Sequence, residues 1–427
     1  MRHALPRSIP HSFAVFGLAA CPLAWSLFLP NGAMAANNTF TINDGGTYTH
    51  IFGNYNGQGS IQTGTDPTSG TSSENEITLT SATVSGDVVG GQGYSGSSDT
   101  NSNKVFINGG SFTAGDRGIF GGYTGISGGT ANSNEITLNA MTGSLGTVHG
   151  GTSEEGGSAN NNTVTINAGT IGNIHGGVAQ GISATATGNA VNINGGTVTV
   201  AVVGGQGGGG GSTANIVTIK NGALVTANVF GGISTTNSNT NTVTIDNSFT
   251  GNITGDIYGG YIAGNAASDT ATGNIVNINS SNTTFGNVYG GSSFDSSGDV
   301  FTGNTLNLAA GNTITSVHNM ATLNFTSGGN AGIGTLDTTP TGASGNPKVT
   351  LNTNTYSVDF GGVINGTGGI DKTGTGTLTL NGNNIYSGDT TVTAGTLAGN
   401  IAANTKLTVV NSGATYDGSG AARLIGE

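Results

Sequence analysis

The chain has 427 residues, of which 80 are glycine and only 7% are charged, so its composition does not fit an ordinary α/β enzyme. Its formal net charge of −12 at pH 7, without any basic cluster, argues against nucleic-acid binding. Hydrophobic residues still make up 34% of the chain, and their regular spacing argues against a disordered linker.

Residues 1–35 have the pattern of a secretory signal peptide. Arginines near the start precede an apolar run from about Phe13 to Leu29, and Ala33-Met34-Ala35 then provides a small-x-small cleavage motif. We expect cleavage between Ala35 and Ala36, and therefore an exported chain.

A second pattern competes inside this segment. Leu18-Ala19-Ala20-Cys21 resembles a lipoprotein attachment box. The apolar run continues from Pro22 to Leu29 without a polar tether, which favours cleavage over lipidation of Cys21. The mature chain then has no cysteine, as suits an exported protein. No later segment approaches 18 consecutive apolar residues, so no membrane-spanning helix is predicted.

Residues 36–74 are predicted to form an N-terminal capping coil and a loop. Their segments Asn38 to Ile42 and Ile51 to Gly53 are a degenerate copy of a pattern that recurs nine times in residues 75–320. We therefore divide the chain into the signal peptide, this cap, the nine-copy region, less regular β coils at 321–360 and a terminal segment at 361–427.

Each of the nine copies opens with an asparagine followed by apolar residues two and four positions later, which predicts a short β-strand with one face in a core. A new copy begins every 26 to 33 residues, which indicates a solenoid, since one copy has no face that it can bury alone. Two interpretations of the asparagine stay open: a stacked amide ladder, or a residue that suits the turn into each strand. The asparagines are Asn75, Asn103, Asn134, Asn162, Asn189, Asn215, Asn241, Asn274 and Asn304.

Each copy ends in an apolar pair, followed in the first eight copies by a glycine pair, as in Ile174 to Gly177. We interpret the glycines as positions of positive φ where the chain turns sharply. In the ninth copy Asn319 and Met320 replace them. The polar stretches between copies vary in length, which predicts projecting loops where binding specificity would lie.

One column predicts the register of the stack. The residue after the asparagine is Glu76, Lys104 and Glu135 in three consecutive copies, and stacking in register would bring these alternating charges together.

The segment 361–427 holds the most specific pattern in the chain. Residues Gly368 to Leu380 (GGIDKTGTGTLTL), Asn384 to Gly388 (NIYSG) and Thr390 to Leu397 (TTVTAGTL) resemble the passenger-associated repeat of autotransporters. The resemblance implies an all-β fold, a right-handed parallel β-helix of about ten or more coils, exported to the bacterial surface. It also implies an outer-membrane barrel, which this chain does not contain; a truncated reading frame and a separately encoded barrel both stay open.

We predict no catalytic residues and no cofactor. A G-x-S-x-G match at residues 125–129 precedes no predicted helix and is expected by chance in a glycine-rich chain. His149 and His175 occupy one position in consecutive copies and are weak candidates for a metal site. The same position holds Phe, Tyr or Val in most other copies, which favours a packing column with stacked histidines.

We therefore expect either an adhesin or a structural stalk. Its partners would be glycans or proteins on host or sister cells, with self-association through the polar columns. The expected location is the cell surface or the extracellular space, associated with the outer membrane, with the periplasm as the alternative. The alternative function is a carbohydrate-active enzyme, a lyase or a glycosidase, which the lack of a recurrent acidic cluster disfavours.

Overall fold

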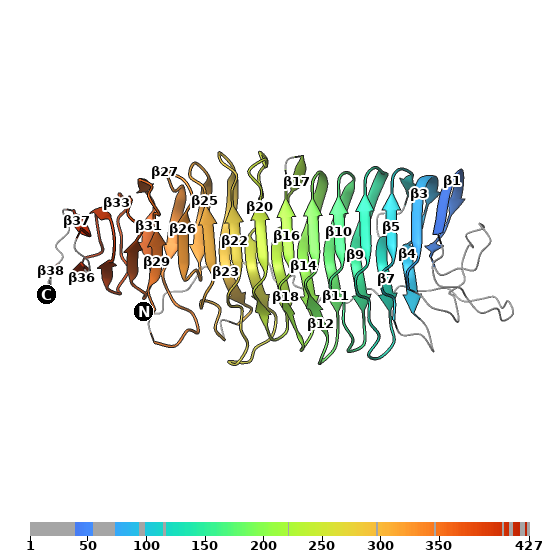
Figure 1. The fold of residues 1–427 in the computed structure, drawn as a ribbon, viewed down its shortest axis with the longest axis horizontal. Coiled ribbons are helices and arrows are strands. Elements are labelled where there is room, and N and C mark those ends of the chain that lie inside the picture. The colour runs from blue at the N-terminus through green and yellow to red at the C-terminus, as the bar shows by residue number, and fades with distance from the viewer. Residues whose placement is uncertain are drawn as a thin grey trace, which may run out of the picture.

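The computed structural model describes residues 39–53, 73–93, 99–113, 117–220, 222–295, 298–345, 347–403, 405–409, 413–418 and 423–424. The signal peptide, with Cys21, Ala35 and Ala36, lies outside them. All named elements of the described residues are β-strands, and every strand pairing there is parallel, so the predicted all-β parallel solenoid is confirmed. No helix within these ranges is long and apolar enough to cross a membrane. Figure 1 shows the coils stacked in one row from the blue N-terminal strands to the red C-terminal ones.

Two long parallel sheets run along the stack, and they are joined where β9 (Thr142–Ser153) pairs with strands of both. The first sheet contains the strands that follow the repeat asparagines. It consists of β1 (Thr39–Tyr48), β3 (Glu76–Val84), β5 (Lys104–Ile107), β6 (Ser111–Phe112), β8 (Glu135–Leu138), β10 (Thr163–Ile166), β13 (Ala190–Ile193), β16 (Ile216–Ile219), β20 (Thr242–Ile245), β22 (Ile275–Ile278), β24 (Thr305–Leu308), β26 (Thr322–Phe325), β29 (Val349–Asn352), β32 (Ile370–Thr373), β34 (Thr390–Val392), β36 (Lys406–Val409) and β38 (Arg423–Leu424).

The second sheet contains the strands that carry the glycine pairs. It consists of β2 (Ile51–Phe52), β4 (Val88–Gly93), β7 (Gly118–Thr124), β9 (Thr142–Ser153), β11 (Thr170–Ala179), β14 (Gly196–Gly207), β17 (Ala223–Val225), β18 (Asn228–Ser234), β21 (Ile257–Ile262), β23 (Thr284–Ser293), β25 (Thr313–His318), β28 (Ile333–Asp337) and β31 (Val363–Asn365).

Two shorter sheets complete the coils. One consists of β12 (Thr185–Thr187), β15 (Gly211–Thr213) and β19 (Ser238–Asn239). The other lies toward the C-terminal end of the stack and consists of β27 (Gly329–Asn330), β30 (Val358–Phe360), β33 (Thr377–Leu380), β35 (Thr396–Gly399) and β37 (Thr415–Asp417).

Corresponding positions of successive copies pair residue for residue. Glu76 pairs with Lys104, and Lys104 with Glu135, which confirms the register that the alternating charges predicted. At the N-terminal end β1 pairs with β3 and β2 with β4, so residues 39–53 form a coil that stacks on the first repeat. After residue 320, β26, β29, β32, β34 and β36 extend the first sheet one after another.

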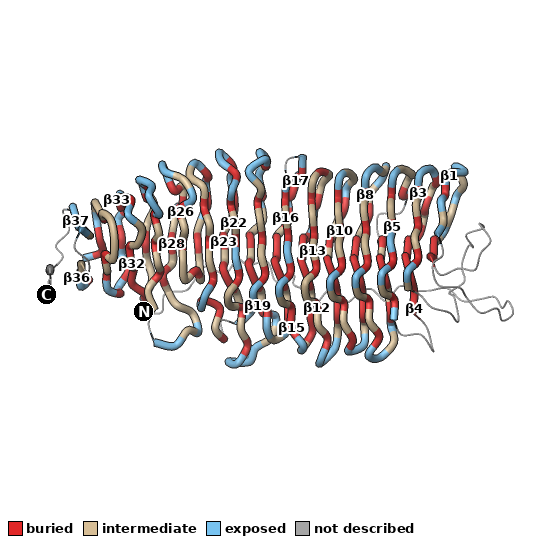
Figure 2. The backbone as a smooth tube through the Cα atoms, in the orientation of Figure 1, coloured by how far each residue is buried: buried red, intermediate tan, exposed pale blue. Residues whose placement is uncertain are grey.

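The core is built from columns of apolar side chains. The two predicted columns, which begin at Ile77 and Leu79, are fully buried throughout the nine copies. The apolar pair supplies a third column, which begins at Val88. A fourth inward column was not predicted, and it contains Leu145, Ile171, Val198, Val225, Ile253, Phe285, Ile314 and Ile333. Figure 2 shows the result as buried segments in the middle of the strands and exposed segments at many of the turns.

Candidate functional site

The nine repeat asparagines form a buried, hydrogen-bonded ladder. From Asn103 to Asn304, each Oδ1 accepts two bonds from the preceding asparagine, one from Nδ2 at 2.9–3.3 Å and one from the backbone N at 2.8–3.0 Å. All nine side chains are at most 1% exposed. An unpaired buried amide group costs about 1–3 kcal/mol, so this pairing is what allows a column of amides inside the solenoid.

A left-handed residue precedes every one of these asparagines. Its φ lies between 54° and 70° in all nine copies, so the ladder and the turn into the strand are parts of one arrangement. This column was not predicted from the sequence, where its signal is that three of its nine members are glycine. The residues are Glu74, Ser102, Ser133, Asn161, Gly188, Ala214, Thr240, Gly273 and Gly303.

The prediction that the glycine pairs mark positive-φ turns was wrong. The pairs lie within strands of the second sheet, and none of them has positive φ. A Cβ atom on Gly176 would lie 2.8 Å from Cβ of Asn189, and one on Gly177 would lie 2.7 Å from Oδ1 of the same asparagine. Still closer to these Cβ atoms would be backbone carbonyl oxygens, that of Gly204 at 2.2 Å and that of Ala159 at 2.3 Å. Glycine is required here because both the asparagine ladder and neighbouring backbone pack directly against the pair.

The ladder and the glycine pairs end together. The pairing of β24 with β26 puts Ala321 where a tenth asparagine would stand, and Met320 replaces the second glycine and is fully buried. The Nδ2 group of Asn304 instead donates to the carbonyl oxygens of Ala271 and Val300, at 2.9 and 2.7 Å. A methionine and an alanine thus take the place that a glycine and an asparagine take in the other copies.

The second residue of the apolar pair forms a column of rings along the second sheet. Phe230, Tyr258, Tyr289 and His318 stack in successive coils, with centroids 4.7–4.9 Å apart and interplanar angles of 5–15°. Burial raises the pKa of Tyr289 to about 12, with the nearby Asp256 carboxylate as a second cause. Each ring covers the face of the next, so the column presents mainly ring edges to solvent.

His149 and His175 lie in the same column, with centroids 4.7 Å apart and planes at 79°. Both nitrogens of His149 already bind hydroxyl groups, Nε2 that of Thr147 at 2.7 Å and Nδ1 that of Thr152 at 3.1 Å. Burial lowers the pKa of His149 well below its usual range and the pKa of His175 to about 4. Within the described ranges no three His, Cys, Asp or Glu side chains are grouped so as to hold a metal ion. These contacts favour packing over metal ligation.

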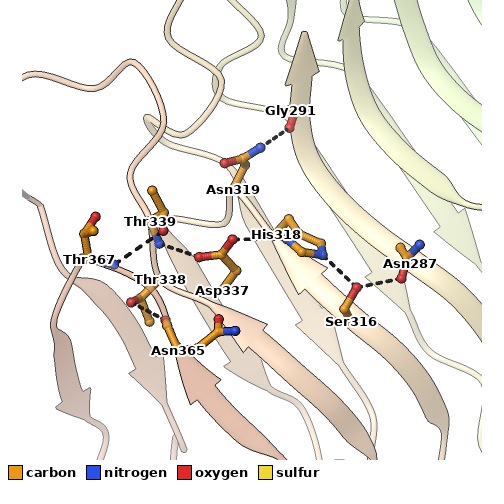
Figure 3. A network of polar contacts seen from close by, with 10 residues as sticks. All are labelled: Asn287, Gly291, Ser316, His318, Asn319, Asp337, Thr338, Thr339, Asn365 and Thr367. Carbon is orange, nitrogen blue, oxygen red and sulfur yellow. Dashed lines mark hydrogen bonds and ion pairs between the residues drawn. The ribbon is translucent and has the colours of Figure 1, made fainter. Parts of the chain in front are cut away.

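The ring column ends in a polar network (Figure 3). Ser316 Oγ lies 2.7 Å from Nε2 of His318 and donates to Oδ1 of Asn287 at 2.6 Å. Nδ1 of His318 lies 3.4 Å from Oδ2 of Asp337 in the next coil, and the backbone N of Thr339 donates to Oδ1 of that aspartate at 2.9 Å. The network therefore joins three successive coils.

Burial would raise the pKa of Asp337, but the hydrogen bonds from His318 and Thr339 outweigh it and lower that pKa. Neither Ser316 nor Asp337 was predicted from the sequence to belong to a site. Ser316 is two residues before His318 on β25, whereas Asp337 reaches the network only through the pairing of β25 with β28. To predict this contact from the sequence, one would need the register between two coils. The loops that connect these coils differ in length, so the register cannot be found from a fixed spacing.

Lys372 is a buried charge in the terminal coils. It occupies an inward position of the first sheet, in register with apolar residues of both neighbouring strands, and its side chain is fully buried. Its ammonium group donates three hydrogen bonds of 2.8–3.0 Å, and burial lowers its pKa to about 8. The acceptors are the carbonyl oxygens of Thr373, Gly374 and Ala394.

Comparisons with known proteins agree with this description. Residues 370–398 match the family model described as Passenger-associated-transport-repeat, which confirms the predicted resemblance to autotransporter passengers. The chain is also similar to "Adhesin BmaC autotransporter" of Brucella suis biovar 1 (strain 1330), with 43% identity over 96 residues. This alignment covers 22% of the chain and 3% of that protein. No solved structure matches the chain.

The parallel solenoid and the passenger repeat together indicate a segment of the autotransporter-passenger type. Such a repeat is a feature of exported chains, so the match indicates export to the cell surface.

Proposed function

We propose that the chain is a surface-exposed passenger that acts as an adhesin, in which the solenoid carries side-chain columns and loops away from the cell. The observation that supports this most directly is the combination, in one chain, of a passenger repeat at residues 370–398 with a continuous parallel stack before it. The similar protein from Brucella suis, which is named an adhesin autotransporter, supports the same function.

Columns of identical polar side chains, repeated from coil to coil, make the contact with the partner. One outer amide ladder, with bonds of 2.7–2.9 Å, is formed by Asn108, Asn139, Asn167 and Asn194. Another, with bonds of 2.7–3.0 Å, is formed by Asn277, Asn307, Asn324 and Asn352. An amide has two N–H donors and two acceptor lone pairs, and a ladder uses one of each.

A column of this kind presents the same polar group about every 4.8 Å along the stack. Many weak contacts that form together give an avidity well above that of each contact. The partners are glycans or proteins on host or sister cells, and a second copy of the chain is itself a surface with the same repeat. Self-association between cells therefore follows from the same columns.

The experiment has two parts. Protease applied to intact cells should remove the chain from their surface, and deletion of the gene should reduce attachment of the cells to host cells or to one another. A chain protected from external protease overturns the surface location. An exposed chain whose deletion changes no attachment overturns the adhesin and leaves a structural stalk.

A matched pair of variants assigns the contact to the outer ladder. Replacing Asn139 and Asn167 by alanine removes exposed amides without touching the buried ladder, and we expect at least about a tenfold loss of attachment from lost avidity. The control replaces Thr163 by alanine, because this outward residue of β10 lies in the same coil as Asn167 but pairs with Glu135 and Ala190 and so belongs to no amide column.

A further inference from the structure

The network at the end of the ring column brings together the groups that acyl transfer requires. A serine hydroxyl becomes a good nucleophile when a base accepts its proton and a third group orients that base. Ser316 Oγ lies 2.7 Å from one nitrogen of His318, and the other nitrogen lies 3.4 Å from Asp337 (Figure 3). We propose that Ser316, His318 and Asp337 form a nucleophilic site that hydrolyses small, activated carboxylic esters.

The fold holds each group in place. Ser316 and His318 are two positions apart on one strand, so their side chains lie on the same face of the second sheet. Pairing of β25 with β28 puts Asp337 at the position of His318, one coil further along. The imidazole packs flat on Tyr289, with centroids 4.9 Å apart, and the backbone N of Thr339 holds the carboxylate at 2.9 Å.

The site is open to solvent. The side chains of His318 and Asp337 are 28% and 33% exposed, and Ser316 is half-buried. A site on the face of a sheet has no deep pocket that could bind a large acyl group. The substrate class that fits is therefore an ester with a short acyl chain and a good leaving group. For such an ester, substrate binding contributes little to the rate, which depends mainly on the reactivity of the nucleophile.

The same solenoid contains an incomplete version of the site. Thr147 Oγ1 lies 2.7 Å from Nε2 of His149, at the corresponding positions of an earlier coil. There the other nitrogen contacts the Thr152 hydroxyl at 3.1 Å in place of a carboxylate, and the histidine is only 5% exposed. The earlier pair lacks both the acid and the access, so it is a natural control for the later site.

The reaction proceeds in two steps. The hydroxyl of Ser316 first rotates so that its hydrogen bond goes to Nε2 of His318 in place of Oδ1 of Asn287. Ser316 Oγ then attacks the carbonyl carbon as its proton is transferred to Nε2. The imidazolium, stabilised by Asp337, then protonates the leaving alkoxide as the ester C–O bond breaks. Water attacks the acyl-serine, its proton passes through His318 to Ser316 Oγ, and a carboxylic acid leaves.

The test begins with covalent labelling of the purified chain. A fluorophosphonate should phosphonylate Ser316, which mass spectrometry of peptides would locate. Hydrolysis of p-nitrophenyl acetate should exceed that of the Ser316→Ala variant about a hundredfold or more, the lower end of the range for a positioned general base. Asp337→Asn should reduce both signals, because the neutral amide no longer stabilises the imidazolium.

The controls separate chemistry from folding and from adhesion. Thr147→Ala should leave labelling and hydrolysis unchanged, and the Ser316→Ala chain should keep the urea unfolding midpoint and the cell attachment of the parent chain. If the parent chain gains no adduct on Ser316, or if Ser316→Ala hydrolyses the ester as fast as the parent, the proposal fails and the network is only structural. Neither result affects the proposed adhesin function, which is measured on cells.

Discussion

Residues 75–304 and residues 321–409 extend the same sheets but bury their polar groups differently. In the first region each buried asparagine is satisfied by its neighbours along the stack, beginning with the bond from Asn75 to Asn103. In the second region the buried Lys372 is satisfied by three nearby carbonyl groups. A ladder requires the same residue in every coil, whereas the buried lysine requires only carbonyl groups of its own turn and of the next coil.

This difference explains why the sequence repeats strictly in one region and loosely in the other. An asparagine ladder needs a glycine pair beside it, since a Cβ there would meet the amide. After Asn304 the asparagine and the glycine pair are replaced together. The repeat in the first region is therefore a packing requirement shared by two columns, and substitutions in either column should reveal that coupling.

The largest effect is expected from Gly177→Ala. The new Cβ would lie 2.3 Å from the carbonyl oxygen of Ala159 and 2.7 Å from Oδ1 of Asn189, so backbone and ladder must both shift. Overpacking of a tight core costs typically 1–3 kcal/mol, and we expect a loss of about 3 kcal/mol, measured as a lower urea unfolding midpoint. Gly361→Ala is the control, because its Cβ would meet no atom within 4 Å. Equal midpoints for both variants would contradict the packing role.

Lys372→Met should have the next largest effect. The methionine side chain fills a similar volume but leaves three carbonyl oxygens without their donor, at a cost of about 1–3 kcal/mol. Lys406→Met is the matched control, because Lys406 is an exposed residue of β36 in the same sheet. Urea unfolding followed by circular dichroism measures both. A Lys372→Met chain as stable as the control would show that desolvation of the charge cancels its hydrogen bonds.

A smaller effect tests the coupling of the two columns directly. Ala321→Asn places an amide in the space that Met320 fills, and we expect a loss of about 2 kcal/mol. Adding Met320→Gly should recover part of the loss, because the new amide then extends the ladder from Asn304 beside a glycine. The coupling energy of such neighbours is about 0.5–3 kcal/mol in double-mutant cycles. Strictly additive effects of the two substitutions would argue against the shared packing requirement.

The sequence predicted what depends on spacing along one coil. A period of two residues within a strand predicts the inward positions that begin at Ile77 and Leu79. A period of one coil between strands predicts the pairing of Glu76 with Lys104. The role of the glycine pairs was misread, because glycine serves both positive φ and close approach, and only the three-dimensional neighbour distinguishes these.

The candidate site was the least predictable part. The asparagine ladder was foreseen as one of two interpretations, since identical residues in register can satisfy each other. Ser316 and Asp337 come from coils whose connecting loops differ in length, so no fixed spacing links them in the sequence. Polar contacts between coils follow from the register of β25 and β28, which the sequence pattern does not specify beyond residue 320.

The smallest expected effect concerns the two histidines of the ring column. Burial holds the pKa of His175 at about 4, below the 6.5 of the unfolded chain, and lowers that of His149 as well. Between pH 6.5 and pH 4 the unfolded chain therefore binds more protons than the folded one, so stability is lost as the pH falls through this window. His175→Phe places in the column a residue that it already accepts at Phe120 and Phe230, and it should make the urea midpoint less dependent on pH between 7 and 4.5. The carboxylates titrate in both chains and cancel in the comparison, so an unchanged pH dependence would mean that the buried imidazole is protonated in the folded solenoid.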